Sequence, residues 1–471
     1  MDIDDRLREV EREIFARSPE HQIDPTLDRI AMLTSLLGDP QRSFPIIHVT
    51  GTNGKTSMTR MIDGLLRERG LRTGRFTSPH LASIRERIVV DGVPLSAERF
   101  VELYDEILPY VQLVDERQPA HLSFFEVLTG MMFAAFADAP VDVGVIEVGL
   151  GGKWDATNVA DGAVAVIGPV AMDHMQYLGD TIEQIAFEKA GIIKPGAIAI
   201  IAQQQLAAAE VLLAQAASVG ASVAREGIEF GVVAREMAVG GQQLVLQGLR
   251  GTYEDIYLPL FGTHQASNAA CSLAAVEAFA GVSDSGVVLD PGLVRDGFAK
   301  ISSPGRLEIL RRSPTVLADA AHNPSGMAAT LEALTETFGF ARVIGVVAIY
   351  QDKDVAGFLE ELEPVLSDVV VTANSSPRSM SAEELAVIAR EVFGEDRVLV
   401  RDRIDDAIEA AVSLADEPVG DDLPGSTAVL ITGSVATAGD ARLLLAPGDP
   451  VDAPPPPGMP ARHSFTAGDL S

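Results

Sequence analysis

The sequence predicts an α/β protein built from mainly parallel sheets that are covered by helices. Short β-rich runs alternate with helical patterns from Phe44 onward, a glycine-rich turn joins the first run to its helix, and the alternation restarts after Gly305. A chain of 471 residues is too long for one compact core and fits two or three domains, and its 47% content of hydrophobic residues is ample for their cores. We therefore expect a nucleotide-binding domain over residues 1–301, a smaller Rossmann-like domain over 302–447 and a disordered proline-rich tail over 448–471.

The first strand and helix follow each other directly. Residues 45–50 (PIIHVT) read as a buried strand, and Met58, Met61 and Leu65 then recur at helical spacing, with Gly70 as the C-terminal cap. Further strands are expected at 141–148 and 163–168, and helices at 97–115, 122–137 and 181–190.

The character of the chain changes between residues 223 and 260. Short β-like pieces separated by glycines predict a small antiparallel insertion there. An alanine-rich helix over 265–280 and a hinge at 301–305 follow. The second domain has strands expected at 315–318, 343–348, 369–372 and 428–432, and a surface loop at 416–426.

Charge and cysteine content exclude several classes of protein. The net charge of −31 argues against a broad nucleic-acid-binding face, which needs clustered Lys and Arg. The single cysteine, Cys271, cannot form an internal disulfide and belongs to no metal-binding pattern. The charged N-terminus is no secretory signal, and no uncharged apolar run is long enough to cross a bilayer. We expect a cytoplasmic protein with no membrane partner, and a monomer.

The strongest indication of a chemical function is the glycine-rich loop between the first strand and its helix. Glycine lets the backbone N–H groups of such a loop point at phosphate oxygens, the lysine adds a positive charge, and the threonine offers a hydroxyl to Mg²⁺. The first glycine of the general GxxxxGK[ST] pattern is replaced by Val49. The residues predicted to bind the nucleotide are Gly51, Thr52, Asn53, Gly54, Lys55, Thr56 and Ser57.

Further motifs follow in a fixed order along both predicted domains. They are TSPHL at 77–81, ERI at 86–88, FFE at 124–126, EVGLGG at 147–152, DATN at 155–158, DH at 173–174, EKAG at 188–191, HQASN at 264–268, PGRLE at 304–308, DAAHNP at 319–324 and DKD at 352–354. With the loop, they resemble the folylpolyglutamate synthase / dihydrofolate synthase family of the Mur ligase superfamily over about residues 25–445. Thr56, Lys153 and Trp154 depart from the family's usual residues, and Lys153 lacks the planar fork of an arginine.

The resemblance implies an ATP-dependent ligase that joins L-glutamate to dihydropteroate, to folates, or to both. The acid's carboxylate would attack the γ-phosphate to give an acyl phosphate, and the glutamate amine would then displace phosphate. Catalysis of this kind is mostly positioning and charge neutralisation. The resemblance also implies two Mg²⁺ ions.

The resemblance assigns roles to individual residues. Lys189 would be carbamylated, and Arg306 would reach the phosphates when the domains close. The implied catalytic residues are Lys55, Glu147, His174, Lys189, Arg306, Asp319 and His322. Thr56, Ser78, Glu147, His174 and Lys189 would hold the metal ions. Further nucleotide contacts would come from Gln265, Asn268, Arg306 and Asp319. The acid or glutamate would contact Ser78, His80, Phe124, Phe125, Asp155 and His322.

Several assignments have a plainer alternative. Lys189 could be a surface lysine paired with Glu188 or another neighbour, although the motif favours carbamylation. His174 could be a hydrogen-bonded neighbour of the site, since Mg²⁺ rarely prefers imidazole. Phe124 and Phe125 suit a core at a helix start, and Gln265 with Asn268 suits a helix cap. For the whole chain, the alternatives are a cell-wall precursor ligase, a P-loop NTPase that forms no amide, and a catalytically dead binding relative.

Overall fold

The computed structural model describes residues 2–18, 25–283, 288–417 and 427–446. It confirms the α/β class. The larger sheet has eight strands in the order β4-β3-β2-β5-β1-β6-β7-β8, and all neighbouring strands are parallel except the pairs β2–β3 and β3–β4 at one edge. Its strands are β1 (Ile46–Thr50), β2 (Thr73–Phe76), β3 (Ile88–Val90), β4 (Val93–Pro94), β5 (Val143–Glu147), β6 (Val164–Ile167), β7 (Ile198–Ile201) and β8 (Ser222–Arg225).

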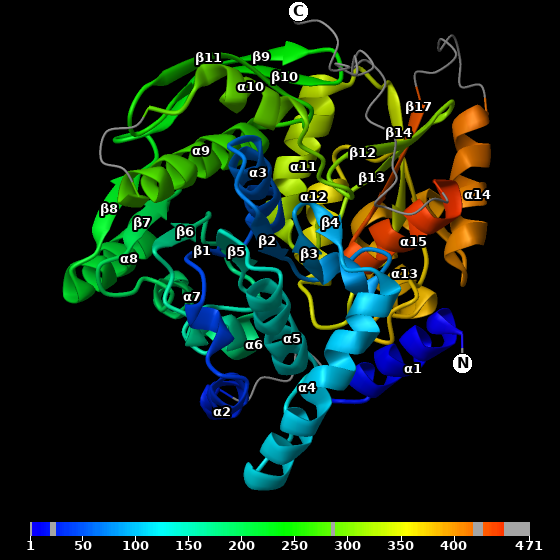
Figure 1. The fold of residues 1–471 in the computed structure, drawn as a ribbon. Helices are drawn as coiled ribbons and strands as arrows, with labels where there is room; N and C mark the ends of the chain where they lie inside the picture. The colour runs from blue at the N-terminus through cyan, green and yellow to red at the C-terminus, as the bar shows by residue number, and fades with distance from the viewer. Residues whose placement is uncertain (1, 19–24, 284–287, 418–426, 447–471) are drawn as a thin grey trace, which may run out of the picture.

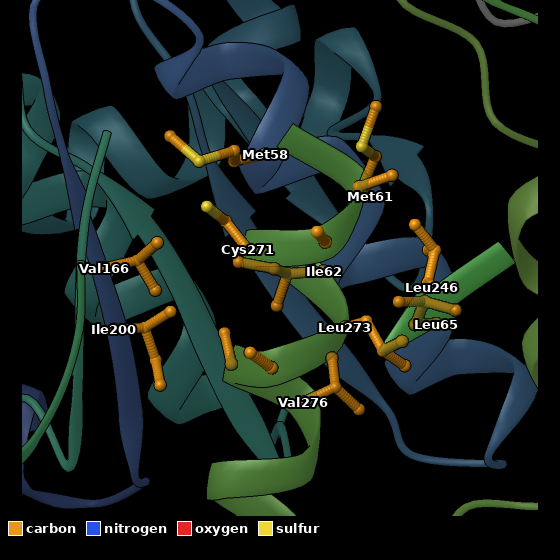
Figure 2. Close-up of a cluster of buried hydrophobic side chains, with 14 of the residues drawn as sticks. Met58, Met61, Ile62, Leu65, Val166, Ile200, Leu246, Cys271, Leu273 and Val276 are labelled. Carbon is orange, nitrogen blue, oxygen red and sulfur yellow. The ribbon is translucent and has the colours of Figure 1, made fainter. Parts of the chain in front are cut away.

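Helices cover both faces of this sheet because its strands are apolar on both sides. On β6, Val166 packs into the core beneath α3 (Lys55–Glu68) and α9 (Thr263–Ser283), whereas Ile167 packs on the opposite face. Figure 2 shows the first of these cores, where Met58, Met61 and Ile62 of α3 meet Cys271 of α9. The helices of the opposite face are α1 (Ile3–Phe15), α2 (Asp28–Leu36), α4 (Ala97–Arg117), α5 (Phe124–Asp138), α6 (Met175–Leu178), α7 (Ile182–Ala190) and α8 (Leu206–Val219).

The predicted antiparallel insertion is present, but it begins later than expected. It consists of β9 (Gly231–Ala238), β10 (Gly241–Gln247) and β11 (Thr252–Leu258), which lie over α9 together with α10 (Pro291–Ala299) (Figure 1). Assigning Val223 to the insertion is wrong, because β8 pairs in parallel with β7 and extends the large sheet. Helix α8 supplies the crossover that such a parallel pair requires.

The C-terminal half contains a six-stranded sheet in the order β12-β13-β17-β14-β15-β16, in which only β12 runs antiparallel to its neighbour. Its strands are β12 (Glu308–Arg312), β13 (Thr315–Ala318), β14 (Arg342–Val347), β15 (Asp368–Val371), β16 (Val398–Val400) and β17 (Thr427–Thr432). Helices α11 (Pro324–Thr337), α12 (Val355–Leu362) and α13 (Ala382–Phe393) cover one face, and α14 (Ile404–Asp416) and α15 (Val435–Leu445) cover the other.

The strands of the larger sheet precede residues 301–305 in the chain, and those of the six-stranded sheet follow them. The domain boundary drawn there stays a prediction. The predicted tail and most of the predicted loop at 416–426 lie outside the described residues. Within the described part of the chain, no helix is both long and apolar enough to cross a membrane.

The fold brings the loops after several strand ends together. In open α/β sheets, ligands bind beyond the carboxyl ends of the strands. Here the loop after β6 contacts two loops of the C-terminal half: Asp173 accepts hydrogen bonds from Asn323, which follows β13, and from Lys353, which follows β14. The carboxyl edges of the two large sheets therefore face one another.

Candidate active site

The phosphate loop has the tight backbone that its glycines predict. Gly54, which precedes α3, has φ +82°, and a Cβ there would lie 2.5 Å from Oδ1 of Asn268. A Cβ on Gly51 would lie 3.0 Å from Cα of Gly168, on the loop after β6. Both glycines are therefore required for the close approach of the loop to its neighbours.

Two lysines converge on one carbonyl of this loop. Lys55 donates to the carbonyl oxygens of Gly51 and Thr52, both at 3.1 Å. Lys189, at the end of α7, also donates to the Gly51 oxygen, at 3.0 Å, and is only 3% exposed. Burial and the charge of Lys55 lower the pKa of Lys189 to about 7. The interpretation of Lys189 as a surface lysine is therefore wrong.

A buried carboxylate lies beside the loop. Glu147, the last residue of β5, accepts hydrogen bonds from the Thr56 hydroxyl at 2.9 Å and from the Ser78 backbone N–H at 3.2 Å. Burial raises the pKa of Glu147 to about 7, against the opposing charge of Lys55. Among the described residues no lysine, arginine or histidine forms an ion pair with it. Three of the predicted metal ligands thus meet at one point.

A second polar cluster joins the two halves of the chain. Lys353 donates to Oδ1 of Asp173 at 2.7 Å and to Nε2 of His174 at 3.1 Å, and Asn323 donates to Oδ2 of Asp173 at 2.9 Å. His322 Nε2 lies 3.6 Å from the same carboxylate. Burial alone would raise the pKa of Asp173, but His322 and Lys353 hold it well below its usual range.

Other predicted nucleotide residues border the loop. Asn53 and Asn323 exchange hydrogen bonds between their side-chain amides, at 3.4 and 3.2 Å. On α9, Asn268 donates to Gln265, and Gln265 donates to the Ser57 hydroxyl at 3.4 Å. Thr52 is held to the loop after β6 by a hydrogen bond from its hydroxyl to the Ala171 carbonyl at 3.0 Å.

Arg306 and Asp319 lie together at the start of the C-terminal half. Asp319 accepts hydrogen bonds from the backbone N–H groups of Leu307 and Ala321, both at 2.9 Å. Its carboxylate therefore fixes the hinge against the loop after β13. The Arg306 guanidinium donates to the Gly305 carbonyl at 3.1 Å. Among the described residues, neither Arg306 nor Asp319 forms a hydrogen bond with the phosphate loop.

A cavity of about 310 Å³ opens beside the segment that follows β5, where Gly149 and Leu150 line it. Phe125 and Asp155 line it, together with Trp154 and Tyr177. Its volume is in the range of small-molecule sites. Asp155 is held rigidly, because Oδ2 accepts from the Leu150 N–H at 2.9 Å and Oδ1 accepts from the Thr157 N–H at 2.9 Å.

Two other predicted substrate residues lie apart from the lining of this cavity. Phe124 stacks on Phe15 with ring centroids 5.1 Å apart, and the Arg87 guanidinium lies over its ring. His80 accepts a hydrogen bond from Arg87 Nε at 2.9 Å. Burial and Arg87 lower the pKa of His80 to about 3, so its imidazole is neutral at pH 7.

The chain matches two family models that together span most of it: the Mur ligase middle domain over residues 49–276 and the Mur ligase glutamate ligase domain over residues 305–435. It is also 52% identical over 456 residues to a dihydrofolate synthase/folylpolyglutamate synthase of Mycobacterium tuberculosis, covering 93% of each chain. This chain belongs to the dihydrofolate synthase/folylpolyglutamate synthase family.

Further members of the family agree in sequence and in structure. A dihydrofolate synthase/folylpolyglutamate synthase of Bacillus subtilis is 34% identical, covering 79% of this chain and 87% of its own. The M. tuberculosis folylpolyglutamate synthase complexed with ADP superposes with a TM-score of 0.91 at 52% identity, over 95% of this chain and all of that one. Escherichia coli FolC in complex with DHPP and ADP gives 0.77 at 30% identity, over 90% and 93%.

Magnesium, which the family resemblance implies, fits one part of this site better than another. Thr56 and Glu147 offer the hydroxyl and carboxylate oxygens that Mg²⁺ prefers, and the buried Glu147 carboxylate lacks a cationic partner among the described residues. His174 fits less well, because its Nε2 accepts the hydrogen bond from Lys353. Ligand atoms of Asp173, His174 and His322 lie within 4.8 Å of one another, but the Lys353 ammonium already contacts two of them.

No role was predicted from the sequence for Asp173 or Lys353, and neither was the ion pair that they form. Both residues stand in motifs that the sequence displays, DH at 173–174 and DKD at 352–354. Their pairing spans 180 positions. A lysine flanked by two aspartates resembles a solvated turn, so only the folded arrangement reveals that the Lys353 side chain is buried, at 4% exposed.

Proposed function

We infer that this chain is an ATP-dependent ligase of the folate type, which joins L-glutamate to dihydropteroate, to reduced folates, or to both. The observation that carries the inference is that the end of β5 serves both places: Glu147 accepts a hydrogen bond from Thr56 of the phosphate loop, and Gly149 and Leu150, just after it, line the cavity. A phosphate donor and an acid substrate bound at these two places would meet near the end of β5. Membership of the family supports the same reaction.

The chemistry divides among the described residues. The acid's carboxylate attacks the γ-phosphorus and releases ADP, and the glutamate amine then attacks the acyl phosphate and releases inorganic phosphate. Lys55 and the N–H groups of the loop bind the phosphates, and Arg306 joins them when the halves close. Closure of the two halves also excludes water from the acyl phosphate. Thr56, Ser78 and Glu147 would hold Mg²⁺, which would neutralise part of the phosphate charge when bound.

The cavity between Phe125 and Asp155 suits the ring system of a pterin acid. Asp155 presents a carboxylate that accepts hydrogen bonds, and Phe125, Trp154 and Tyr177 present aromatic surface for stacking. Ser78 and His80 lie on the loop that follows β2, and Leu81 of the same loop lies beside Gly305 and Gly439 of the C-terminal half. His322 lies beside Asp173, where the glutamate would enter.

Carbamylation of Lys189 is part of the same proposal. Carbamylation needs a neutral amine, which attacks CO₂ to form an N–C bond and releases a proton. Burial of Lys189 and the like charge of Lys55 favour the neutral amine, and the resulting anion would remove the repulsion between Lys189 and Lys55. A carbamate carbon signal in carbon-13 spectra after addition of labelled bicarbonate, present in the wild type and absent in Lys189→Ala, tests it. Full turnover in Lys189→Ala would contradict a catalytic role.

The reaction itself is tested by product analysis. ADP release must require glutamate together with either dihydropteroate or a reduced folate, and the product must be heavier by one glutamyl residue. Running the two acceptors separately determines whether one or both activities exist. Hydrolysis of ATP without glutamate and without product would instead support a P-loop NTPase, and binding without turnover a catalytically dead relative. A cell-wall precursor acting as the acceptor would support the other Mur-type reaction.

The cytoplasmic location and the monomeric state stay predictions. Light scattering of the purified protein with and without nucleotide tests the second of these. A mass near the 49.8 kDa of one chain is expected in both conditions.

A further inference from the structure

One face of α3 carries a row of polar side chains that runs away from the phosphate loop. Thr56, Arg60, Asp63 and Arg67 follow one another at helical spacing, so their side chains share one face. Thr56 donates to Glu147, Asp63 accepts from Arg75 Nη1 at 2.8 Å, and Arg67 donates to Asp63. Arg60 lies between these partnered residues, one turn beyond Thr56.

Arg60 is the exception in the row. Its guanidinium makes no hydrogen bond and no ion pair with any described residue. Three carboxylates lie close enough to act on it electrostatically: Glu86, Asp63 and Glu147. All three are engaged elsewhere. Glu86 accepts from the N–H groups of Leu81, Ala82 and Ser83. Asp63 accepts from Thr73 and Arg75, and Glu147 accepts from the Thr56 hydroxyl and the Ser78 N–H.

The environment makes an unpaired guanidinium costly. The Arg60 side chain is half-buried, and the buried Arg75 adds a like charge beside it. Burial, reinforced by Arg75, lowers the pKa of Arg60 to about 9, so the group is still charged at pH 7. A charge removed from water is tolerated when a partner of opposite sign completes its hydrogen bonds. Of the four polar residues on this face of α3, only Arg60 has no such partner among the described residues.

We propose that Arg60 binds the carboxylate of the acid substrate, the group that becomes phosphorylated, beside Glu147. This proposal rests on the proposed function and adds a substrate-binding residue to it. The position supports this ligand because helical side chains tilt toward the N-terminus, here toward Thr56 and the phosphate loop. A planar guanidinium also matches a carboxylate with two parallel hydrogen bonds. The γ-phosphoryl group of the nucleotide has similar chemistry, and the experiment separates the two.

The binding test uses the only tryptophan of the chain, Trp154, which lines the cavity and reports occupancy by its fluorescence. Dihydropteroate and its carboxamide are titrated into the wild type, Arg60→Met and Arg60→Lys, and ADP is titrated separately. In Arg60→Met the affinity for the acid should fall about 10- to 100-fold, while the affinities for the carboxamide and for ADP stay unchanged. Arg60→Lys should recover part of the loss. The matched control is Arg67→Met, from the same row of α3, which should bind the acid as the wild type does.

Each other outcome overturns the proposal. If the wild type and Arg60→Met bind the acid with equal affinity, Arg60 does not contact the substrate carboxylate. If only the affinity for ADP falls, Arg60 binds the phosphoryl group instead. The melting temperature of the ligand-free protein gives an independent readout. Removing an unpaired, half-buried charge should leave it unchanged or raise it, so a marked fall would reveal a structural partner. If the wild type itself binds no dihydropteroate, the proposed function fails rather than the role of Arg60.

Discussion

Lys55 and Lys189 donate hydrogen bonds to the same oxygen atom, the carbonyl of Gly51, at 3.1 and 3.0 Å. Two ammonium groups that share one neutral acceptor repel each other, and this repulsion contributes to the lowered pKa of Lys189. An anion bound in the loop relieves the repulsion. The loop is therefore arranged to gain stability when phosphate arrives.

This arrangement predicts how nucleotide stabilises the protein. ADP should raise the melting temperature of the wild type in a concentration-dependent way, and Lys55→Met should weaken ADP binding by at least about 10-fold, since charged hydrogen bonds to phosphate are lost. Thermal melts over a series of ADP concentrations provide the measurement. The control is Lys300→Met, which removes an exposed lysine that pairs with Glu68. An unchanged ADP response in Lys55→Met would contradict the assignment.

The buried pair of Asp173 and Lys353 predicts a non-additive mutant cycle. Lys353→Met leaves the Asp173 carboxylate without its nearest cation and should lower the free energy of unfolding by about 3–5 kcal/mol. Asp173→Asn alone should also destabilise, whereas the double variant should recover much of the loss. Urea denaturation of the four proteins measures the coupling. Turnover should stay low in the double variant, because the groups that position His174 and His322 are absent. Additive destabilisation would mean that the pair does not interact.

The cavity predicts a selective defect in substrate binding. Asp155→Asn keeps the size of the side chain and one acceptor, yet removes the charge that faces the cavity. The Michaelis constant for dihydropteroate should rise about 10-fold or more, as expected when a charged hydrogen bond is lost, and that for ATP should stay within about two-fold. Initial-rate measurements with each substrate varied in turn provide the check. The control is Asp161→Asn, outside the cavity lining.

Buried histidine predicts a loss of stability in acid. His48 of β1 is fully buried, its Nε2 lies 2.8 Å from the Thr157 hydroxyl, and burial lowers its pKa to about 3. Between pH 6.5 and about 3 the unfolded chain binds a proton at this position that the native protein does not bind. The free energy of unfolding should therefore fall by up to about 1.4 kcal/mol for each pH unit below 6.5. His48→Gln should flatten this part of the stability profile, measured by denaturant titration at each pH. Parallel profiles for the two proteins would contradict the prediction.

Local signals predicted those parts of the fold that are contiguous in the sequence. The run 45–50, the glycine loop and the apolar spacing of α3 stand side by side, so they define β1, the loop and the helix together. The misplaced start of the insertion has the opposite cause. Glycine density is a local signal, whereas the parallel pairing of β8 with β7 is made across α8. The three-residue strands β3 and β16 are too short to display an alternating pattern.

The candidate site divides in the same way. The residues of the phosphate loop could be predicted from the local glycine, lysine and threonine pattern. The roles of Glu147, Lys189 and Asp155 could be predicted only from the resemblance to the family. Burial of Lys189 follows from packing of α7 against the loop, which no sequence window displays. The ion pair of Lys353 and the isolation of Arg60 both depend on what lies around a side chain, and that is decided by segments far away in the chain.

The reciprocal amide contact between Asn53 and Asn323 has a consequence for the timing of the reaction. Neutral hydrogen bonds contribute only about 0.5–1.5 kcal/mol each, so this contact by itself resists separation of the halves only weakly. The buried ion pair of Asp173 and Lys353 crosses between the same halves. The rate at which product leaves should therefore depend on the ion pair rather than on the contact at the phosphate loop.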